Sequence, residues 1–182
     1  MYKYIYLSID PGTNSLGTTI NGITTDNQWR VIHSTTTNID LLTKILYEDT
    51  IVKTHGMRLA RMFTCEQVIY KFACDWNVNS VVSESPYMGR FPQAFSALVE
   101  CMQSMRRGVY QYNPYTKFDV IDPSTIKKAV GVPGKSGDKN LMRLATQKLV
   151  GDYVNVDWLD EHSIDSICVG YTWFQQSYGE QW

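Results

Sequence analysis

The order of strand-like and helix-like segments is the feature that most constrains the fold of this chain. Three β-rich runs, at about 4–10, 15–23 and 29–37, follow one another across short turn signals, which favours an antiparallel meander. Apolar residues then recur at helical spacing over about 55–76, and shorter strands and helices alternate beyond. This order predicts an α/β fold with a mixed sheet of three antiparallel and two parallel strands, flanked by helices.

The later part of the chain is divided by turn and capping residues. Residues 38–54 give no clear pattern, and no repeat, low-complexity tract or domain boundary is evident. We therefore expect one domain over residues 1–182. The remaining expected elements are a strand over 81–84, a helix from about 95 that stops near Gly108, a strand over 118–121, a short helix capped by Ser124, a helix over about 138–150 and a last amphipathic helix that begins at about 160 and has apolar positions from 164 to 174.

Composition excludes several classes of protein. No run of about 18 apolar residues is present, so no membrane span is expected. The first residues lack an apolar export segment, and we expect a cytoplasmic protein of a bacterium or of a phage-infected cell. The four cysteines form no Cys-x-x-Cys pair, which argues against zinc ribbons and redox dithiols. Cys65, Cys101 and Cys168 lie in apolar helical patterns and are expected to be buried free thiols.

The formal net charge of −1 conceals a segregation of charge along the chain. Residues 90–148 carry 10 basic and 4 acidic side chains, whereas residues 149–182 carry 6 acidic side chains and no Lys or Arg. A basic segment attracts a polyanion, and an acidic one repels it unless cations intervene. Because charge runs are often only solvated faces, this pattern alone gives weak support for a nucleic-acid partner.

Carboxylates fall where strands end. Asp10 ends the first strand, Glu84 ends the fourth, and Asp165 lies near the start of the last helix, three residues after His162. Clustered, partly buried carboxylates repel one another unless a cation compensates, and hard oxygen ligands suit Mg²⁺ or Mn²⁺. Such a set can hold two ions about 4 Å apart, which activate water for hydrolysis of a phosphodiester. Taken singly, each residue is also compatible with an ordinary turn or a helix N-terminus.

Several stretches of the sequence resemble the RuvC-type Holliday junction resolvases, which belong to the RNase H-like superfamily. The resemblance runs in order along almost the whole chain. It is carried by Asp10-Pro11-Gly12-Thr13, Glu84-Ser85-Pro86-Tyr87, Ala94-Phe95-Ser96-Ala97-Leu98, Asp122-Pro123-Ser124, Gly137-Asp138-Lys139 and His162-Ser163-Ile164-Asp165.

The resemblance implies an RNase H-like fold and a homodimeric, Mg²⁺-dependent endonuclease that nicks two opposed strands of a four-way DNA junction symmetrically. Its products would carry a 5′-phosphate and a 3′-hydroxyl, and Mn²⁺ would substitute for Mg²⁺. The catalytic and metal-binding positions map onto Asp10, Glu84, His162 and Asp165, which would hold two ions. Some relatives carry Asp where this chain has His162.

The resemblance also assigns DNA contacts. Tyr87 occupies the position of an aromatic residue that stacks on an unpaired base, and the DNA-contacting lysines map onto Lys127 or Lys128 and onto Lys139. The neighbouring loop would bring Lys135 to the phosphates, although each lysine is also compatible with an ordinary solvated side chain.

The implied dimer would use the helix that follows Glu84. Its apolar stripe is also typical of an intramolecular core. The stripe consists of Phe95, Leu98, Met102 and Met105.

Three other functions remain open. The loop after Asp10 also resembles the phosphate loop of actin- and Hsp70-type ATPases, but residues 90–182 contain no second such loop. A catalytically silent junction-binding scaffold would not require the four-residue set. Another RNase H-like nuclease, acting on flaps, RNA–DNA hybrids or RNA precursors, would have the same metal site and is the main competitor.

Overall fold

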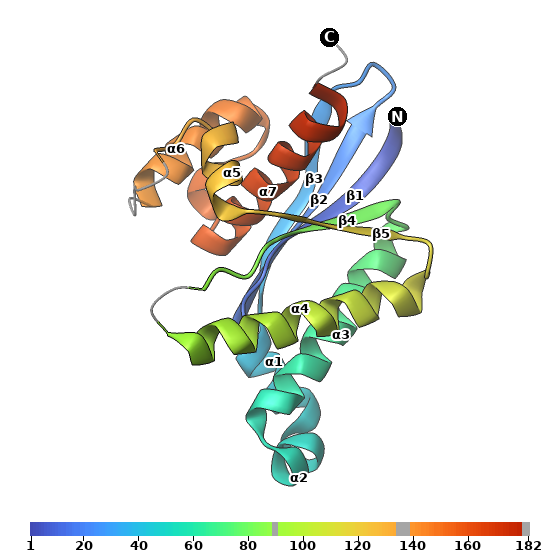
Figure 1. Cartoon of the computed structure of the whole chain (residues 1–182). Helices are drawn as coiled ribbons and strands as arrows, with labels where there is room; N and C mark the ends of the chain where they lie inside the picture. Colours follow the sequence, from blue (N-terminus) through green and yellow to red (C-terminus); the bar gives the residue numbers. More distant parts are fainter. Residues whose placement is uncertain (89–90, 134–138, 180–182) are drawn as a thin grey trace.

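A computed structural model of the chain describes residues 1–88, 91–133 and 139–179. Its five-stranded sheet has the order β3-β2-β1-β4-β5 (Figure 1), in which β1, β2 and β3 are antiparallel and β4 and β5 run parallel to β1. The predicted mixed sheet is confirmed. Its strands are β1 (Tyr2–Asp10), β2 (Ser15–Thr24), β3 (Trp29–Asn38), β4 (Ser80–Glu84) and β5 (Lys117–Ile121).

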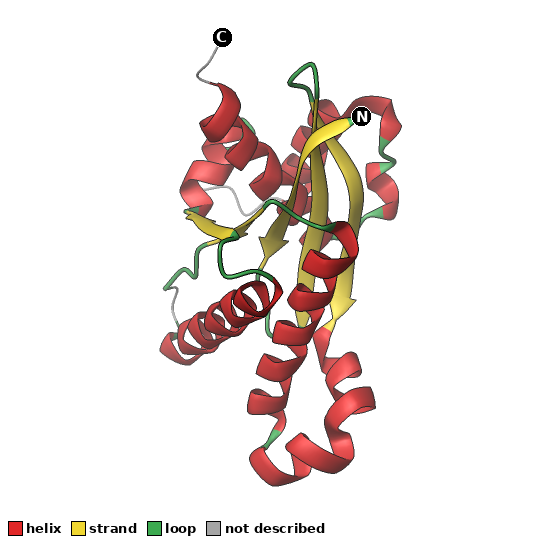
Figure 2. Ribbon diagram, turned by 90° about the vertical axis from the view of Figure 1, so that its right-hand side faces the viewer, coloured by secondary structure: helices red, strands yellow, loops and turns green. Residues whose placement is uncertain are grey.

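Helices cover both faces of the sheet. In Figures 1 and 2, α5, α6 and α7 lie on one face, and α3 and α4 lie on the other, with α1 beside α3. Among the described helices, none is long and apolar enough to cross a membrane. The helical elements are α1 (Ile39–Tyr47), η1 (Glu48–Val52), α2 (Lys53–His55), α3 (Met57–Trp76), α4 (Pro92–Tyr112), α5 (Pro123–Ala129), α6 (Lys139–Val150), η2 (Gly151–Tyr153), η3 (Val156–Trp158) and α7 (Glu161–Tyr178).

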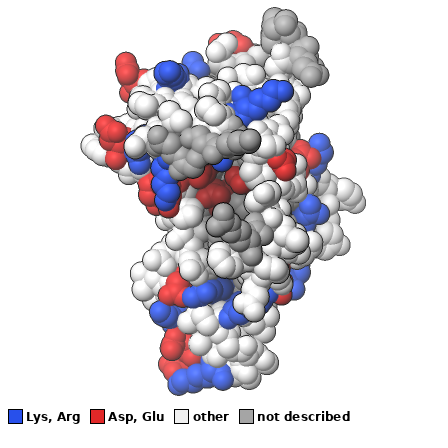
Figure 3. Space-filling view, turned by 60° about the vertical axis from the view of Figure 1, so that its left-hand side comes forward, with Lys and Arg blue, Asp and Glu red and all other residues white. Residues whose placement is uncertain are grey.

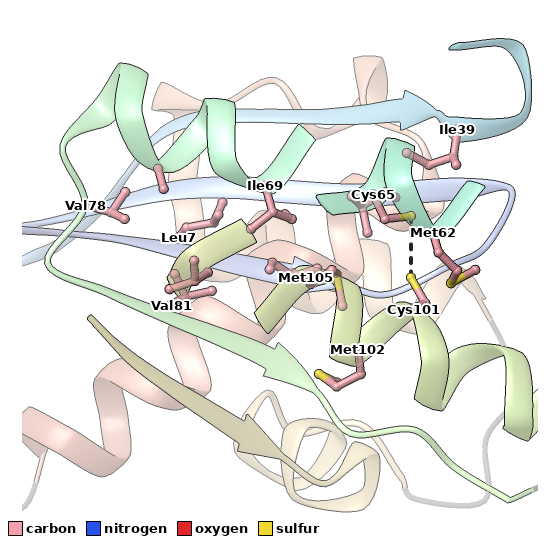
Figure 4. Close-up of a cluster of buried hydrophobic side chains, with 14 of the residues drawn as sticks. Leu7, Ile39, Met62, Cys65, Ile69, Val78, Val81, Cys101, Met102 and Met105 are labelled. Carbon is pink, nitrogen blue, oxygen red and sulfur yellow. Dashed lines mark hydrogen bonds between the residues drawn. The ribbon is translucent and has the colours of Figure 1, made fainter. Parts of the chain in front are cut away.

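Each face of the sheet has its own apolar core because side chains alternate along a strand. Leu7 and Ile9 of β1 join the cluster beneath α3 and α4 (Figure 4), whereas Tyr6 joins the cluster beneath α7. In the first cluster the Cys65 and Cys101 sulfurs lie 3.6 Å apart as free thiols. The predicted burial of these two cysteines and of Cys168 is confirmed, while Cys74 is exposed.

A ladder of hydrogen bonds fixes α7 along β1. The Tyr6 hydroxyl donates to the Gly170 carbonyl (2.7 Å), and the Ser8 hydroxyl donates to the Ser166 carbonyl (2.7 Å). Two residues along a strand advance about 6.7 Å and four along a helix about 6 Å, so the two elements stay in step. The next step places Asp10 beside the first turn of α7.

Three features differ from or extend the predicted elements. The helix α4 continues past Gly108, because this glycine lets α4 approach α3: a Cβ there would lie 2.4 Å from the Glu66 carbonyl oxygen. The N-cap of α5 is Asp122, whose Oδ1 accepts the Ser124 amide at 2.8 Å, so the predicted cap at Ser124 is wrong. Residues 38–54, which had no clear pattern, form the end of β3, then α1, η1 and most of α2.

Candidate active site

Asp10 and Glu84 lie side by side at the ends of two adjacent parallel strands. Ile9 pairs with Ser83 in the register of β1 and β4, so the residues that follow are neighbours. Alternation along each strand directs both carboxylates to the α7 face. The two acids therefore lie together at the carboxyl-terminal ends of β1 and β4, as their positions at strand ends in the sequence indicate.

The first turn of α7 supplies the other two predicted residues. Asp160 caps this helix, because its Oδ1 accepts the Ser163 amide at 2.9 Å. The same oxygen accepts the Thr36 hydroxyl at 2.5 Å, which ties the helix start to β3. His162 Nδ1 then lies 2.7 Å from Asp10 Oδ2, and Asp165 follows one turn later.

Burial and mutual repulsion disfavour ionisation of the carboxylates. Burial, followed by the charges of Asp10 and Asp165, raises the pKa of Glu84 to about 8. Burial, followed by the charge of Asp10, raises the pKa of Asp165 to about 7. Among the neighbouring charges, that of Asp10 contributes most to raising the pKa of both Glu84 and Asp165.

His162 only partly compensates this charge. Burial raises the pKa of Asp10 even though the hydrogen bond from His162 favours the carboxylate. The same hydrogen bond raises the pKa of His162. Near neutral pH the group therefore carries less negative charge than three free carboxylates would, because protons take the place of a compensating cation.

The donor set fits a hard divalent cation in its chemistry. Carboxylate oxygens and a neutral imidazole are ligands for Mg²⁺ or Mn²⁺, and the repulsion among Asp10, Glu84 and Asp165 is what a cation relieves. Among residues 1–88, 91–133 and 139–179, however, no three His, Cys, Asp or Glu side chains stand in a geometry that could hold an ion. His162 instead engages one oxygen of Asp10 directly.

Gly17 of β2 allows the first turn of α7 to pack closely against the sheet, and this role was not predicted from the sequence. A Cβ at Gly17 would lie 2.1 Å from the His162 carbonyl oxygen, so a side chain there must displace the backbone that carries His162. The signal in the sequence was a glycine within a strand, which often marks a close backbone approach.

We expect Gly17→Ala to lower the free energy of unfolding by about 1–3 kcal/mol, the usual cost of overpacking. Thermal unfolding measures the loss. Gly179→Ala is the control, because a Cβ there meets the Gln175 side chain at an ordinary 3.7 Å. Equal melting temperatures for Gly17→Ala and the wild type would show that α7 does not pack closely on β2.

The structure separates the predicted DNA-binding lysines. The charge of Lys127 lowers the pKa of both Glu84 and Asp165, opposing the burial that raises them, so Lys127 lies near the carboxylates. Lys128, although adjacent in sequence, lines a different groove with Thr172 of α7.

The other predicted DNA contacts have different surroundings. Lys139, at the start of α6, forms an ion pair with Glu161 beside His162. Tyr87 is 70% exposed in the segment that follows β4, where a ring is free to stack on a base. Lys135 lies outside the described residues.

Figure 3 shows the charges on this face of the molecule. Acidic side chains gather at mid-height around a hollow, and basic side chains lie beside them. The arrangement agrees with a site in which a polyanion meets carboxylates across bound cations.

The apolar stripe of α4 is divided between two environments. Met102 and Met105 belong to the core beneath α3 and α4, whereas Phe95 and Leu98 are only half-buried. At least half of the stripe therefore serves the core of this chain.

By sequence, no protein-family model and no curated protein matches the chain. Comparison with solved structures does find matches. RuvC of Thermus thermophilus superposes with a TM-score of 0.71 over 96% of each chain, at 13% sequence identity.

Two further structures have the same fold. T. thermophilus RuvC in complex with a Holliday junction substrate matches with a TM-score of 0.69 over 97% of this chain and 96% of that chain, at 12% identity. The yeast mitochondrial Holliday junction resolvase Ydc2 matches with a TM-score of 0.65 over 96% of this chain and 79% of that chain, at 13% identity. The protein thus has the RNase H-like fold of RuvC and other Holliday junction resolvases.

Proposed function

We propose that this protein is a metal-dependent endonuclease that cuts four-way DNA junctions by paired, symmetric nicks. The observation that carries the proposal is the meeting of Asp10, Glu84, His162 and Asp165 at one edge of the sheet, from three distant parts of the chain. The fold shared with Holliday junction resolvases supports the choice of substrate.

In this proposal the side chains of Asp10, Glu84, His162 and Asp165 would hold two Mg²⁺ ions. Bound there, the ions would lower the pKa of the attacking water and stabilise the departing 3′-oxygen, leaving a 5′-phosphate and a 3′-hydroxyl. Asp10 would hold an ion from the middle of the set, because it follows Ile9, which pairs with the residue before Glu84, and because its Oδ2 lies 2.7 Å from His162 Nδ1.

His162 has two roles in the proposed site. Without metal, its ring holds Asp10 Oδ2 at 2.7 Å and so orients the central carboxylate. To bind an ion the imidazole must be neutral, so metal binding releases a proton from the site. Rotation of His162 away from Asp10 would free Oδ2 of that carboxylate.

The protein acts as a homodimer in this proposal, because symmetric nicking requires two active sites that face two phosphates related by a two-fold axis. Tyr87 stacks on an unpaired base near the crossover, and Lys127, Lys128, Lys135 and Lys139 contact the DNA backbone. The acidic and basic side chains that lie beside one another on the face shown in Figure 3 suit this binding mode.

A substrate panel tests the proposal. The protein is incubated in Mg²⁺ with a synthetic mobile four-way junction, a flap, a Y-fork and an RNA–DNA hybrid, each labelled on every strand. We expect paired nicks at symmetric positions in the four-way junction and no cleavage in EDTA. Faster cleavage of the hybrid or the flap than of the junction would assign the protein to another class of RNase H-like nuclease.

The two adjacent lysines give a matched test of the site. We expect Lys127→Ala to reduce the cleavage rate at saturating junction by about tenfold or more, because it removes a cation beside charge that develops at the scissile phosphate. Lys128→Ala removes the same charge from a different groove and should change this rate by less than about threefold. Either variant should reduce the slope of the logarithm of the binding constant against the logarithm of salt concentration by about one, the effect of losing one phosphate contact. Equal losses of rate would place both lysines at the same distance from the chemistry.

A further inference from the structure

A groove continues from the proposed active site along the surface of α4. It has a volume of about 360 Å³, and His162 is one of the residues that line it. One wall is the loop between β1 and β2, and the other is the first half of α4. Its lining residues are Gly12, Thr13, Asn14, Ser15, Ala94, Ala97, Leu98 and His162.

The two long walls differ in chemistry. The loop wall presents the hydroxyl and amide side chains of Thr13, Asn14 and Ser15, none of which forms a hydrogen bond with another described residue. The α4 wall presents only the aliphatic side chains of Ala97, Leu98 and Ala94. Hydroxyl and amide donors are common contacts of phosphate oxygens, and an aliphatic surface packs against a sugar that lacks a 2′-hydroxyl.

The loop wall is held in place before any ligand binds. The Asn14 carbonyl accepts the amides of Ile39 and Asp40, at 2.8 and 3.3 Å, and so anchors the loop to the start of α1. A Cβ at Gly12 would lie 2.1 Å from the Ser15 carbonyl oxygen, so the loop turns tightly at this glycine. A preformed wall of this kind positions a ligand at a low entropic cost.

We propose that this groove binds the nucleotide next to the scissile phosphate and that its α4 wall selects deoxyribose over ribose at that position. The inference rests on the proposed nuclease function, since His162 joins the groove to the site of cleavage. A nucleotide bound here directs its phosphate to the loop and its sugar to Ala97 and Leu98. A 2′-hydroxyl on that sugar loses its water without gaining a hydrogen-bond partner.

The test uses junctions that carry one ribonucleotide. The cut position is first mapped on the all-DNA junction. Four further junctions are then made, each with one ribonucleotide at one of the two nearest positions on the 5′ side or the two nearest positions on the 3′ side of the cut. We expect the wild type to cut one of these junctions about 10–100-fold more slowly, because an apolar wall rejects an added hydroxyl only to this degree.

A change in the α4 wall identifies the cause of this selectivity. Ala97→Ser supplies a hydrogen-bond partner and should bring the slow junction to within about threefold of the rate at which the same variant cuts the all-DNA junction. Gln103→Ser, on an exposed position of the same helix, is the control and should keep the wild-type selectivity.

The outcomes are distinct. Equal cleavage of all the ribonucleotide junctions by the wild type, or selectivity that Ala97→Ser leaves intact, would overturn the assignment of the groove while the proposed function stands. Failure of the wild type to cut the all-DNA junction in Mg²⁺ would overturn the proposed function and, with it, the assignment of the groove.

Discussion

We expect Asp10→Asn to lower the rate of junction cleavage by at least about 10³-fold and to leave junction binding nearly unchanged. The expected loss follows from the several kcal/mol that metal-ion catalysis contributes, since each 1.4 kcal/mol is a factor of about ten in rate. Asn keeps the shape of Asp and still offers an oxygen to His162, but it removes the charge that acts most strongly on Glu84 and Asp165.

Single-turnover cleavage and gel-shift binding measure the two quantities separately. Asp157→Asn is the matched control, because this exposed residue undergoes the same change in shape and charge only five residues from His162. Cleavage by Asp10→Asn at the wild-type rate would remove Asp10 from the site. Loss of junction binding by this variant, with cleavage falling in proportion, would make Asp10 a binding residue instead.

Glu84→Gln stabilises the metal-free protein at pH 8. Burial raises the pKa of Glu84 from an ordinary 4.5 to about 8 in the folded state, so the folded protein retains a proton that the unfolded chain releases. The sign follows from this difference: the contribution of Glu84 to the free energy of unfolding is fully present below about pH 4.5 and is lost as the pH rises towards 8. Gln cannot ionise, so the variant avoids this loss.

We expect a gain of about 2 kcal/mol at pH 8, roughly half the full linkage value of 1.4 kcal/mol per pKa unit, because Glu84 is partly exposed and solvent screens its charge. This corresponds to a rise in melting temperature of roughly 4–8 °C for a chain of this size, and to almost none at pH 4.5. Glu48→Gln, at an exposed position, is the control.

Added Mg²⁺ should reverse the order at pH 8. An ion that binds the folded wild type stabilises it by mass action, whereas the variant has lost one of the proposed ligands. Thermal unfolding of both proteins in EDTA and in Mg²⁺, at both pH values, gives the four differences in melting temperature that are required. If the variant melts no higher than the wild type in EDTA at pH 8, the pKa of Glu84 is not raised in the folded protein.

The main elements and the acidic site were predictable because both follow from short-range rules. Alternation and length identify strands, and Asp10 and Glu84 stand where two of them end. Parallel pairing in register then brings these acids together without any detail of packing. The spacing of His162 and Asp165 on one helix was equally readable.

What was not predictable depends on how distant elements pack. The pairing of Ser8 with Ser166 sets the position of α7 along β1, yet isolated serines carry no sign of a partner more than 150 residues away. Lys127 and Lys128 are equivalent in sequence, and only the orientation of α5 separates them. The continuation of α4 past Gly108 likewise depends on the helix packed against it.

Binding of Mn²⁺, followed by the electron paramagnetic resonance signal of the free ion, tests the claim that these four side chains form one metal site. The account predicts two ions bound per wild-type chain at pH 8, and at least tenfold weaker binding of both by Asp10→Asn. Identical Mn²⁺ titrations of the wild type and Asp10→Asn would contradict it.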